Sequence, residues 1–196
     1  MGVSNQYAVD GAVASNELDH DTVAALRASQ GIELGGALTL DANNASTIWT
    51  ASGSAAIGGD GAVGASFGYN TISDRVSAEI LASQAEARRM ALQAQQNSEI
   101  SALVAGGAVA ARSSAVAGSV AINTIDNQAS ARAVDSNLVS VGEITLDARD
   151  HSSVRSLTGA LAYGGSGAGV GLAGSYNTIL GRVYAGILGG NLQAGG

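Results

Sequence analysis

A repeated segment constrains the fold of this chain more than any other feature. The segments SFGYNTI, SVAINTI and AGSYNTI place Asn70, Asn123 and Asn177 at equivalent positions, and a divergent copy, AVASNEL, adds Asn16. The four Asn residues are 54, 53 and 54 positions apart. Self-similarity at a fixed period is the signature of repeat architectures. We therefore predict one array, with repeat 1 at 6–59, repeat 2 at 60–112, repeat 3 at 113–166 and a partial repeat 4 at 167–196.

A second signature supports the same register. The segments LTLDANNASTI, MALQAQQNSEI and ITLDARDHSSV each hold a Leu that is followed by an apolar residue eight positions later. The pairs are Leu40 and Ile48, Leu92 and Ile100, and Leu146 and Val154. Two independent anchors thus agree on the period of the repeat.

Alternate positions before each repeated Asn differ in character, as expected of β-strands, whose successive side chains point to opposite faces. One face carries larger apolar residues: Val9, Val13, Val63, Phe67, Tyr69, Val116, Val120, Ile122, Val170, Leu172 and Tyr176. On the other face, fifteen of sixteen positions are Gly, Ala or Ser, the exception being Asp10. Such a small-residue face predicts a strand that another backbone approaches closely.

The stretch Gly169–Gly174 spells G-x-G-x-x-G, the pattern of a dinucleotide-binding turn. Such a turn ends a strand, opens a helix and precedes an acidic residue by about twenty positions. Here the segment SYNTI and another predicted strand follow instead, and Gly169, Gly171 and Ala173 fall on the small-residue face. We expect neither a nucleotide nor any other cofactor.

Composition limits both the core and the partners. The chain has 28 Gly, no Pro, no Cys and a net charge of −7, and all nine of its basic residues are Arg. A core built without aromatic bulk has to be thin. Affinity for phosphate chains rests on clustered positive charge, so nucleic acid and anionic lipid are unexpected partners.

We expect no signal peptide in residues 1–6, which have no basic and no apolar stretch. We also expect no membrane insertion, because the most apolar window, 101–125, is mostly Ala and Gly and contains Arg112.

The period-two pattern predicts an all-β, solenoid-like rod of Gly/Ala-rich repeats about 53 residues long. In repeat 2 we expect strands near 61–72, 76–82, 88–94 and 100–110. Residues 77–96 have helical propensity, but their counterparts in other repeats contain Gly and alternate, so we expect strand there too. Right-handed coils and stacked antiparallel hairpins both fit, and the short Gly turns favour a solenoid containing hairpins. Two stacked strands per repeat would add about 10 Å for each copy.

Stacking of equivalent residues also assigns a role to the repeated amides. Asn16, Asn70, Asn123 and Asn177 are predicted to lie one above another in a structural ladder, with amides hydrogen-bonded along the stack. Arg75 and Arg182 share a register with Gln128, for which we expect a solvated turn.

These repeats resemble a known class of proteins. The Gly/Ala-rich strand AVxxSxxxNTI, followed by VxAxI at 76–80 and 183–187 and by GxIxLDA at 142–148, is similar to repeats of large secreted bacterial surface proteins. These are the filamentous haemagglutinin-like and leukotoxin-like filamentous adhesins. The resemblance implies an all-β, elongated stalk at the bacterial cell surface, with cell adhesion as its context and no catalytic residues. The first repeat departs from NTI and the second lacks the Gly of GxIxLDA.

Three functions fit these observations. The first is a stalk segment that contacts neighbouring repeats of the same longer protein, with a host or bacterial surface protein or glycan as a further partner. The second is a module that binds glycan, protein or ice, with Tyr7, Trp49, Tyr163 and Tyr184 as exposed platforms. The third is a β-helical polysaccharide-processing enzyme, which would need clustered carboxylates that the sequence does not display.

Isolated polar residues add no further site to these hypotheses. His20 and His151 lie in different registers beside Asp19, Asp21 and Asp150, without the spacing of a zinc site. We expect the two His residues to be solvated. We therefore predict no catalytic, cofactor-binding or metal-binding residue.

Overall fold

The structure, a computed structural model, describes residues 1–195 and contains only β-strands and connecting segments in that range. The strands are β1 (Gly2–Ser4), β2 (Tyr7–Arg27), β3 (Ile32–Gly58), β4 (Gly61–Leu81), β5 (Gln84–Ala110), β6 (Ala115–Ser140), β7 (Ile144–Gly164) and β8 (Gly169–Ala194). The predicted all-β solenoid is confirmed. Residues 77–96 are extended apart from the link at 82–83, as predicted.

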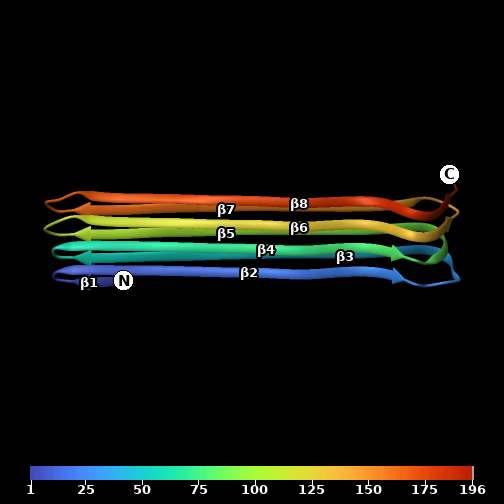
Figure 1. Cartoon of the computed structure of the whole chain (residues 1–196), viewed down its shortest axis with the longest axis horizontal. Helices are drawn as coiled ribbons and strands as arrows, with labels where there is room; N and C mark the ends of the chain where they lie inside the picture. Colours follow the sequence, from blue (N-terminus) through green and yellow to red (C-terminus); the bar gives the residue numbers. More distant parts are fainter. Residues whose placement is uncertain (196) are drawn as a thin grey trace.

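Successive strands run in opposite directions and lie in two different layers (Figure 1). The strands β2, β4, β6 and β8 pair in parallel in that order and form the even sheet. The strands β1, β3, β5 and β7 form the odd sheet in the same way. Each full repeat therefore supplies one long strand to each sheet. At one end, residues 84–87 of β5 also pair with residues 137–140 of β6 and join the layers.

Two details of the predicted strand pattern are wrong. All strand pairings among residues 1–195 are parallel, so the described chain reverses between the layers and forms no antiparallel hairpin. Each repeat also has two long strands where four short ones were expected, because the segment around Arg75 lies inside β4. A repeat therefore adds one rung of about 4.8 Å to the stack, about half the predicted rise.

Both sequence signatures coincide with the strand register. Asn16, Asn70, Asn123 and Asn177 are paired neighbours across the even sheet. Across the odd sheet, Leu40 pairs with Leu92 and Leu92 with Leu146. The equivalent residues of successive repeats thus form continuous rows perpendicular to the strands.

The two ends of each coil turn differently. At the end where even-sheet strands lead into the odd sheet, Ala28, Ala82, Asp135 and Gly189 are equivalent, and their φ angles are 48°, 46°, 49° and 70°. A left-handed residue at this corner of every repeat redirects the chain from one layer to the other. At the opposite end, the links at 59–60, 111–114 and 165–168 perform the return.

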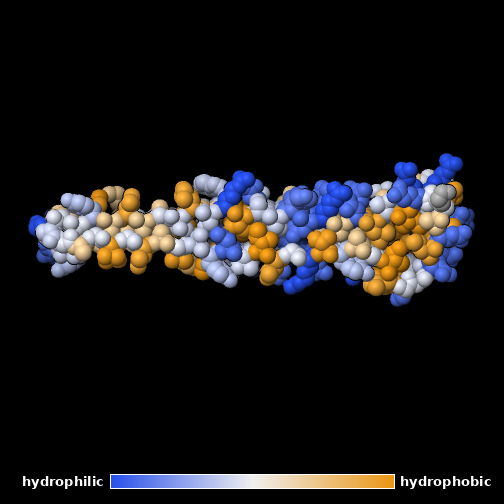
Figure 2. Space-filling model, turned by 90° about the horizontal axis from the view of Figure 1, so that it is seen from above, coloured by the Kyte–Doolittle hydropathy of each residue, from blue (hydrophilic) through white to orange (hydrophobic). Residues whose placement is uncertain are grey.

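The molecule has a narrow half and a wide half (Figure 2). We define the narrow half as the segments between these return links and the Asn row, namely 7–16, 49–58, 61–70, 101–110, 115–123, 155–164 and 169–177. Its buried hydrophobic cluster consists of Ala residues alone. A Cβ atom built on Gly64 would overlap the carbonyl oxygen of Gly107, and one on Gly106 would overlap that of Gly118. The two sheets therefore meet backbone to backbone there.

The wide half occupies the rest of each coil and contains the larger core. Ile80, Met90, Leu92 and Leu138 are buried there with surrounding Ala and Val side chains. A second cluster, made of Ile48, Ile72, Ile100 and Ile125, stands next to the Asn row. The larger inward side chains hold the sheets further apart, which gives the molecule its tapered outline (Figure 2).

Candidate functional site

The four repeated Asn side chains form one chain of hydrogen bonds. The Nδ2 atom of Asn16 donates to Oδ1 of Asn70 at 2.9 Å, Asn70 donates to Asn123 at 2.7 Å, and Asn123 donates to Asn177 at 2.7 Å. The side chains of Asn70 and Asn123 are fully buried. Each inner amide thus has a partner above and below, as in other Asn ladders, and the donors all point in one direction along the stack.

Thr50 ties this ladder to the odd sheet. Its hydroxyl accepts a hydrogen bond from Asn16 Nδ2 at 2.8 Å and donates one to Asn70 Oδ1. Buried polar groups need such partners, because an unpaired one loses its hydration without compensation. The ladder therefore joins rungs and layers, and its inner amides are occupied by one another.

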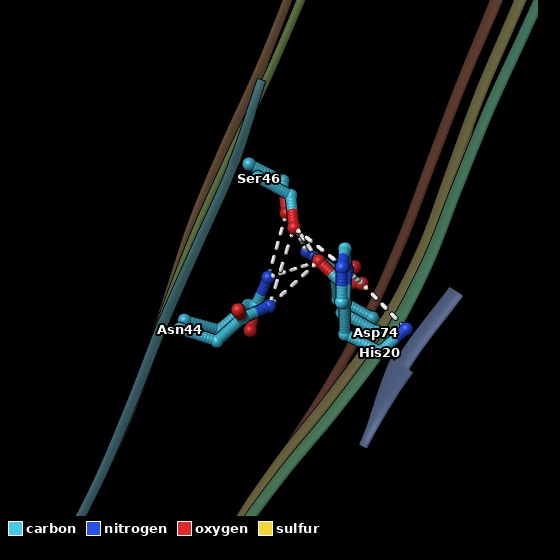
Figure 3. Close-up of polar contacts among 7 residues, drawn as sticks. His20, Asn44, Ser46 and Asp74 are labelled. Carbon is cyan, nitrogen blue, oxygen red and sulfur yellow. Dashed lines mark hydrogen bonds and ion pairs between the residues drawn. The ribbon is translucent and has the colours of Figure 1, made fainter. Parts of the chain in front are cut away.

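A second interior polar row lies four residues beyond the ladder Asn on β2, β4 and β6, with Asp74 at its centre (Figure 3). The Asp74 carboxylate is fully buried. It accepts hydrogen bonds from the backbone N–H of His20 at 3.2 Å, from Asn44 Nδ2 at 3.0 Å and from Gln96 Nε2 at 2.7 Å. Amide and backbone donors from both sheets thus replace the water that this carboxylate would otherwise need.

The same cluster contains a Ser, a His and an Asp, so its geometry can be tested for nucleophilic catalysis. His20 Nδ1 lies 3.2 Å from Asp74 Oδ1 and 3.4 Å from Ser46 Oγ (Figure 3). A Ser–His–Asp relay needs the acid and the nucleophile on opposite ring nitrogens. Here one nitrogen faces both groups, so the imidazole cannot take a proton from Ser46 while Asp74 orients it. The arrangement suits a structural role.

On the outer face of the wide half, Glu79 joins two Arg side chains into an ionic triad. Arg132 donates from Nε at 3.1 Å and from Nη2 at 2.7 Å to one carboxylate oxygen, and Arg27 donates to the other from Nε at 3.0 Å and from Nη2. Burial raises the pKa of the Glu79 carboxyl, but the hydrogen bonds from Arg132 and Arg27 lower it by more, so the pKa lies below its ordinary value. The triad links strands β2, β4 and β6.

The positions singled out in the sequence do not gather into one site. His151 is exposed on β7, paired in register with Asn97. The side chain of His20 is 50% exposed, in line with the expected solvation, but its Nδ1 also lies 3.2 Å from the buried Asp74, a contact that was not expected. The aromatic residues Tyr7, Trp49, Tyr163 and Tyr184 are exposed on four different strands.

Sequence reasoning missed Asp74 and Glu79, the two charged residues with the most buried side chains. One signal was present for the first: His20, Asp74, Asn127 and Gly181 each follow a ladder Asn by four residues. A polar residue at one position in three successive repeats indicates an interior polar row. The signal for Glu79 was weaker: Arg132 holds the equivalent position one repeat later and pairs with it in register, but Arg27 lies two residues beyond Ala25, the registered partner of Glu79 on β2.

The fold and this site define the chain as a two-layered parallel β-solenoid with interior polar ladders. Within residues 1–195, no group of three or more His, Cys, Asp or Glu side chains is placed to hold a metal ion. No helix that could cross a membrane occurs in the same range. Comparison with protein-family models, curated proteins and solved structures finds no match to this chain.

Proposed function

We propose that this chain is a structural stalk segment of a larger secreted bacterial cell-surface adhesin, without catalytic activity. The observation that supports the proposal is the register of the rungs: each long strand pairs with its equivalent one repeat away, in continuous register apart from one shift between Leu34 and Ala37. Further repeats can therefore be added through contacts of the same kind. The resemblance to filamentous adhesin repeats points the same way. Neighbouring repeats of the longer protein are then the principal partners, outside the cell.

Arrays of different length test the stalk. With one rung per repeat, extending an array from four to twenty-four repeats should raise the stack height from about 20 Å to about 115 Å while the cross-section stays constant. Solution scattering and electron microscopy measure both dimensions. A particle that instead grows in all directions would overturn the proposal.

A second experiment addresses the biological role. An epitope carried beyond such arrays on a bacterial surface should be held further from the cell as repeats are added. Binding of the epitope to antibody-coated beads at controlled separation measures this reach. A reach that does not depend on repeat number would rule out a stalk.

A glycan-binding module is the second candidate, and one observation favours it. Trp49 is 72% exposed and borders a shallow hollow of about 220 Å³ together with Ser101 and Arg155. An aromatic face beside polar groups suits a sugar ring. A glycan array comparing the chain with Trp49→Ala tests this, and the absence of any Trp49-dependent signal would eliminate it.

A further inference from the structure

The outer face of the even sheet carries a continuous uncharged patch in the narrow half. Four rows cross the four strands there: Val9, Val63, Val116 and Val170; Gly11, Ala65, Gly118 and Leu172; Val13, Phe67, Val120 and Gly174; Ser15, Tyr69, Ile122 and Tyr176. Val13 is 77% exposed, and even the inner-rung residues Val63, Val116 and Val120 are each 44% exposed. Soluble proteins rarely leave such a patch open unless it takes a partner.

The patch contains a groove of small residues beside a ridge of large ones. Gly11, Ala65 and Gly118 form the floor of a hollow of about 430 Å³, and Val13, Phe67 and Val120 stand along one side. We call the row of Gly11, Ala65, Gly118 and Leu172 the groove row, and the row of Val13, Phe67, Val120 and Gly174 the ridge row. On β8 the sizes are exchanged, because Leu172 stands in the groove row and Gly174 in the ridge row.

The groove row and the ridge row are complementary to each other. On every strand, one of the two rows holds a small residue and the other a large one. A two-fold axis parallel to the stack and passing between the two rows would place each groove row against the ridge row of a second copy. Strand by strand, Gly11 then meets Val13, Ala65 meets Phe67, Gly118 meets Val120 and Leu172 meets Gly174. Sheets that pack face to face interdigitate large and small side chains in this way.

We propose that this face is a docking surface for a second copy of the same chain, packed sheet on sheet. Its sixteen positions, about 4.8 Å apart across strands and about 6.7 Å apart along them, cover roughly 500 Å² per copy, or about 1,000 Å² in total. That area is at the low end of specific interfaces, so four rungs give a reversible, concentration-dependent dimer. Each added repeat enlarges the interface, so long arrays associate laterally with greater strength.

Charge is consistent with this occupant. The patch contains no charged side chain, while the chain as a whole carries a net charge of −7. Two copies therefore repel at long range and attract only through apolar contact. Salt screens the repulsion, so association is expected to strengthen as ionic strength rises.

Sedimentation velocity from micromolar to millimolar concentration tests the proposal with the 196-residue chain. We expect a monomer–dimer equilibrium that Phe67→Ala and Ala65→Phe each weaken by about tenfold, the first by removing the ridge and the second by filling the groove. The double variant Ala65→Phe/Phe67→Ala exchanges ridge and groove, and should restore the dimer. These side chains point outward, so circular dichroism should show the fold intact.

A matched pair of variants distinguishes specific association through this face from nonspecific hydrophobic association. Val120→Asp on the even sheet should abolish association, whereas Leu103→Asp on the outer face of the odd sheet should not, although both residues are 44% exposed in the parent chain. A monomer at all concentrations, a double variant no better than the single ones, or equal effects of the two Asp variants would each overturn the proposal. Binding to neutral phosphatidylcholine vesicles without dimer formation would overturn it in favour of a lipid surface. None of these outcomes depends on stack height, which tests the stalk separately.

Discussion

The narrow and wide halves are built from the same strands in the same registers, yet they solve the packing problem in opposite ways. In the wide half, Met90 and Leu92 point inward and are fully buried, whereas the ion-paired Glu79 lies on the outer face. In the narrow half, most inward residues are Gly, Ala or Ser, with the buried Val104 as an exception, and most large apolar residues point outward. The size of the inward residues sets the distance between the sheets. Where that distance is too small for a branched side chain, the hydrophobic surface of the strand is left outside.

The two halves therefore draw their stability from different sources. The wide half gains free energy from large apolar side chains removed from water, at about 25 cal/mol per Å². The narrow half buries little side-chain area and relies on dispersion between closely packed backbones and on interstrand hydrogen bonds. The following variants test this difference.

The largest effect is expected in the wide half. Leu92→Ala removes a fully buried side chain and should lower the free energy of unfolding by about 2–5 kcal/mol. The counterpart in the narrow half, Ala108→Gly, should lower it by only about 1 kcal/mol. Chemical denaturation measures both values, and equal losses would remove the distinction between the halves.

A smaller loss of stability is expected in the narrow half when a side-chain atom is added instead of removed. Gly64→Ala adds a methyl group where the Gly107 backbone leaves no room, and should cost about 1–3 kcal/mol. The control is Gly53→Ala on the outer side of the odd sheet, where the nearest atom to a new Cβ is 3.8 Å away. If thermal melting finds the two variants equally stable, the sheets are further apart than described.

The Asn row marks the boundary between the halves, and its contribution can be measured in the same range. Asn123→Leu would leave the buried Asn70 amide without its acceptor and the partly buried Asn177 without its donor, at a cost of about 1–3 kcal/mol. Asn137 is exposed and accepts a single hydrogen bond, from the backbone N–H of Asn191. Asn137→Leu should therefore change the melting temperature little. Equal melting temperatures would show that the ladder does not contribute to stability.

The smallest effect concerns acid. Because the pKa of Glu79 is lower in the folded chain, its contribution to stability is complete above its unfolded pKa of about 4.3 and is lost as the pH falls through the folded pKa. Glu79→Gln should lower stability at neutral pH and flatten this acid-induced loss. Glu99→Gln, which removes an exposed partner of Arg155 at 3.4 Å, should leave the pH profile nearly unchanged. Parallel profiles for Glu79→Gln and the parent chain would contradict the triad.

Much of the narrow half could be predicted from the sequence. Alternation over the eight residues before each Asn identifies the inward face, because only Gly, Ala and Ser fit where two backbones meet. The repeat period also places the four Asn residues in one row. These predictions rest on local pattern and on a translation along the chain, both of which a single sequence contains.

The wide half was harder to predict because its polar residues have partners in other repeats or in the other sheet. The charged pair Asp74 and Arg75 suggested a turn, yet Asp74 is an interior residue bound by Asn44 and Gln96 from the opposite sheet. The sequence also does not reveal whether the strands of a sheet are parallel or antiparallel. A Gly-containing turn reverses the chain in the same way whether the next strand joins the same sheet or the facing one. That choice depends on contacts about 53 residues apart.

The direction of the backbone hydrogen bonds has a mechanical consequence. In both sheets they run along the stack, so tension on a stalk acts along the bonds of a whole rung together, while a pull on the chain itself peels the terminal rung residue by residue. Each rung contributes about 4.8 Å of height when folded but about 180 Å of contour when 53 residues are extended. A single-molecule force trace should therefore show rung-by-rung lengthening of that size. Under such a pull the array would unfold and lengthen one coil at a time, while the remaining coils stay folded.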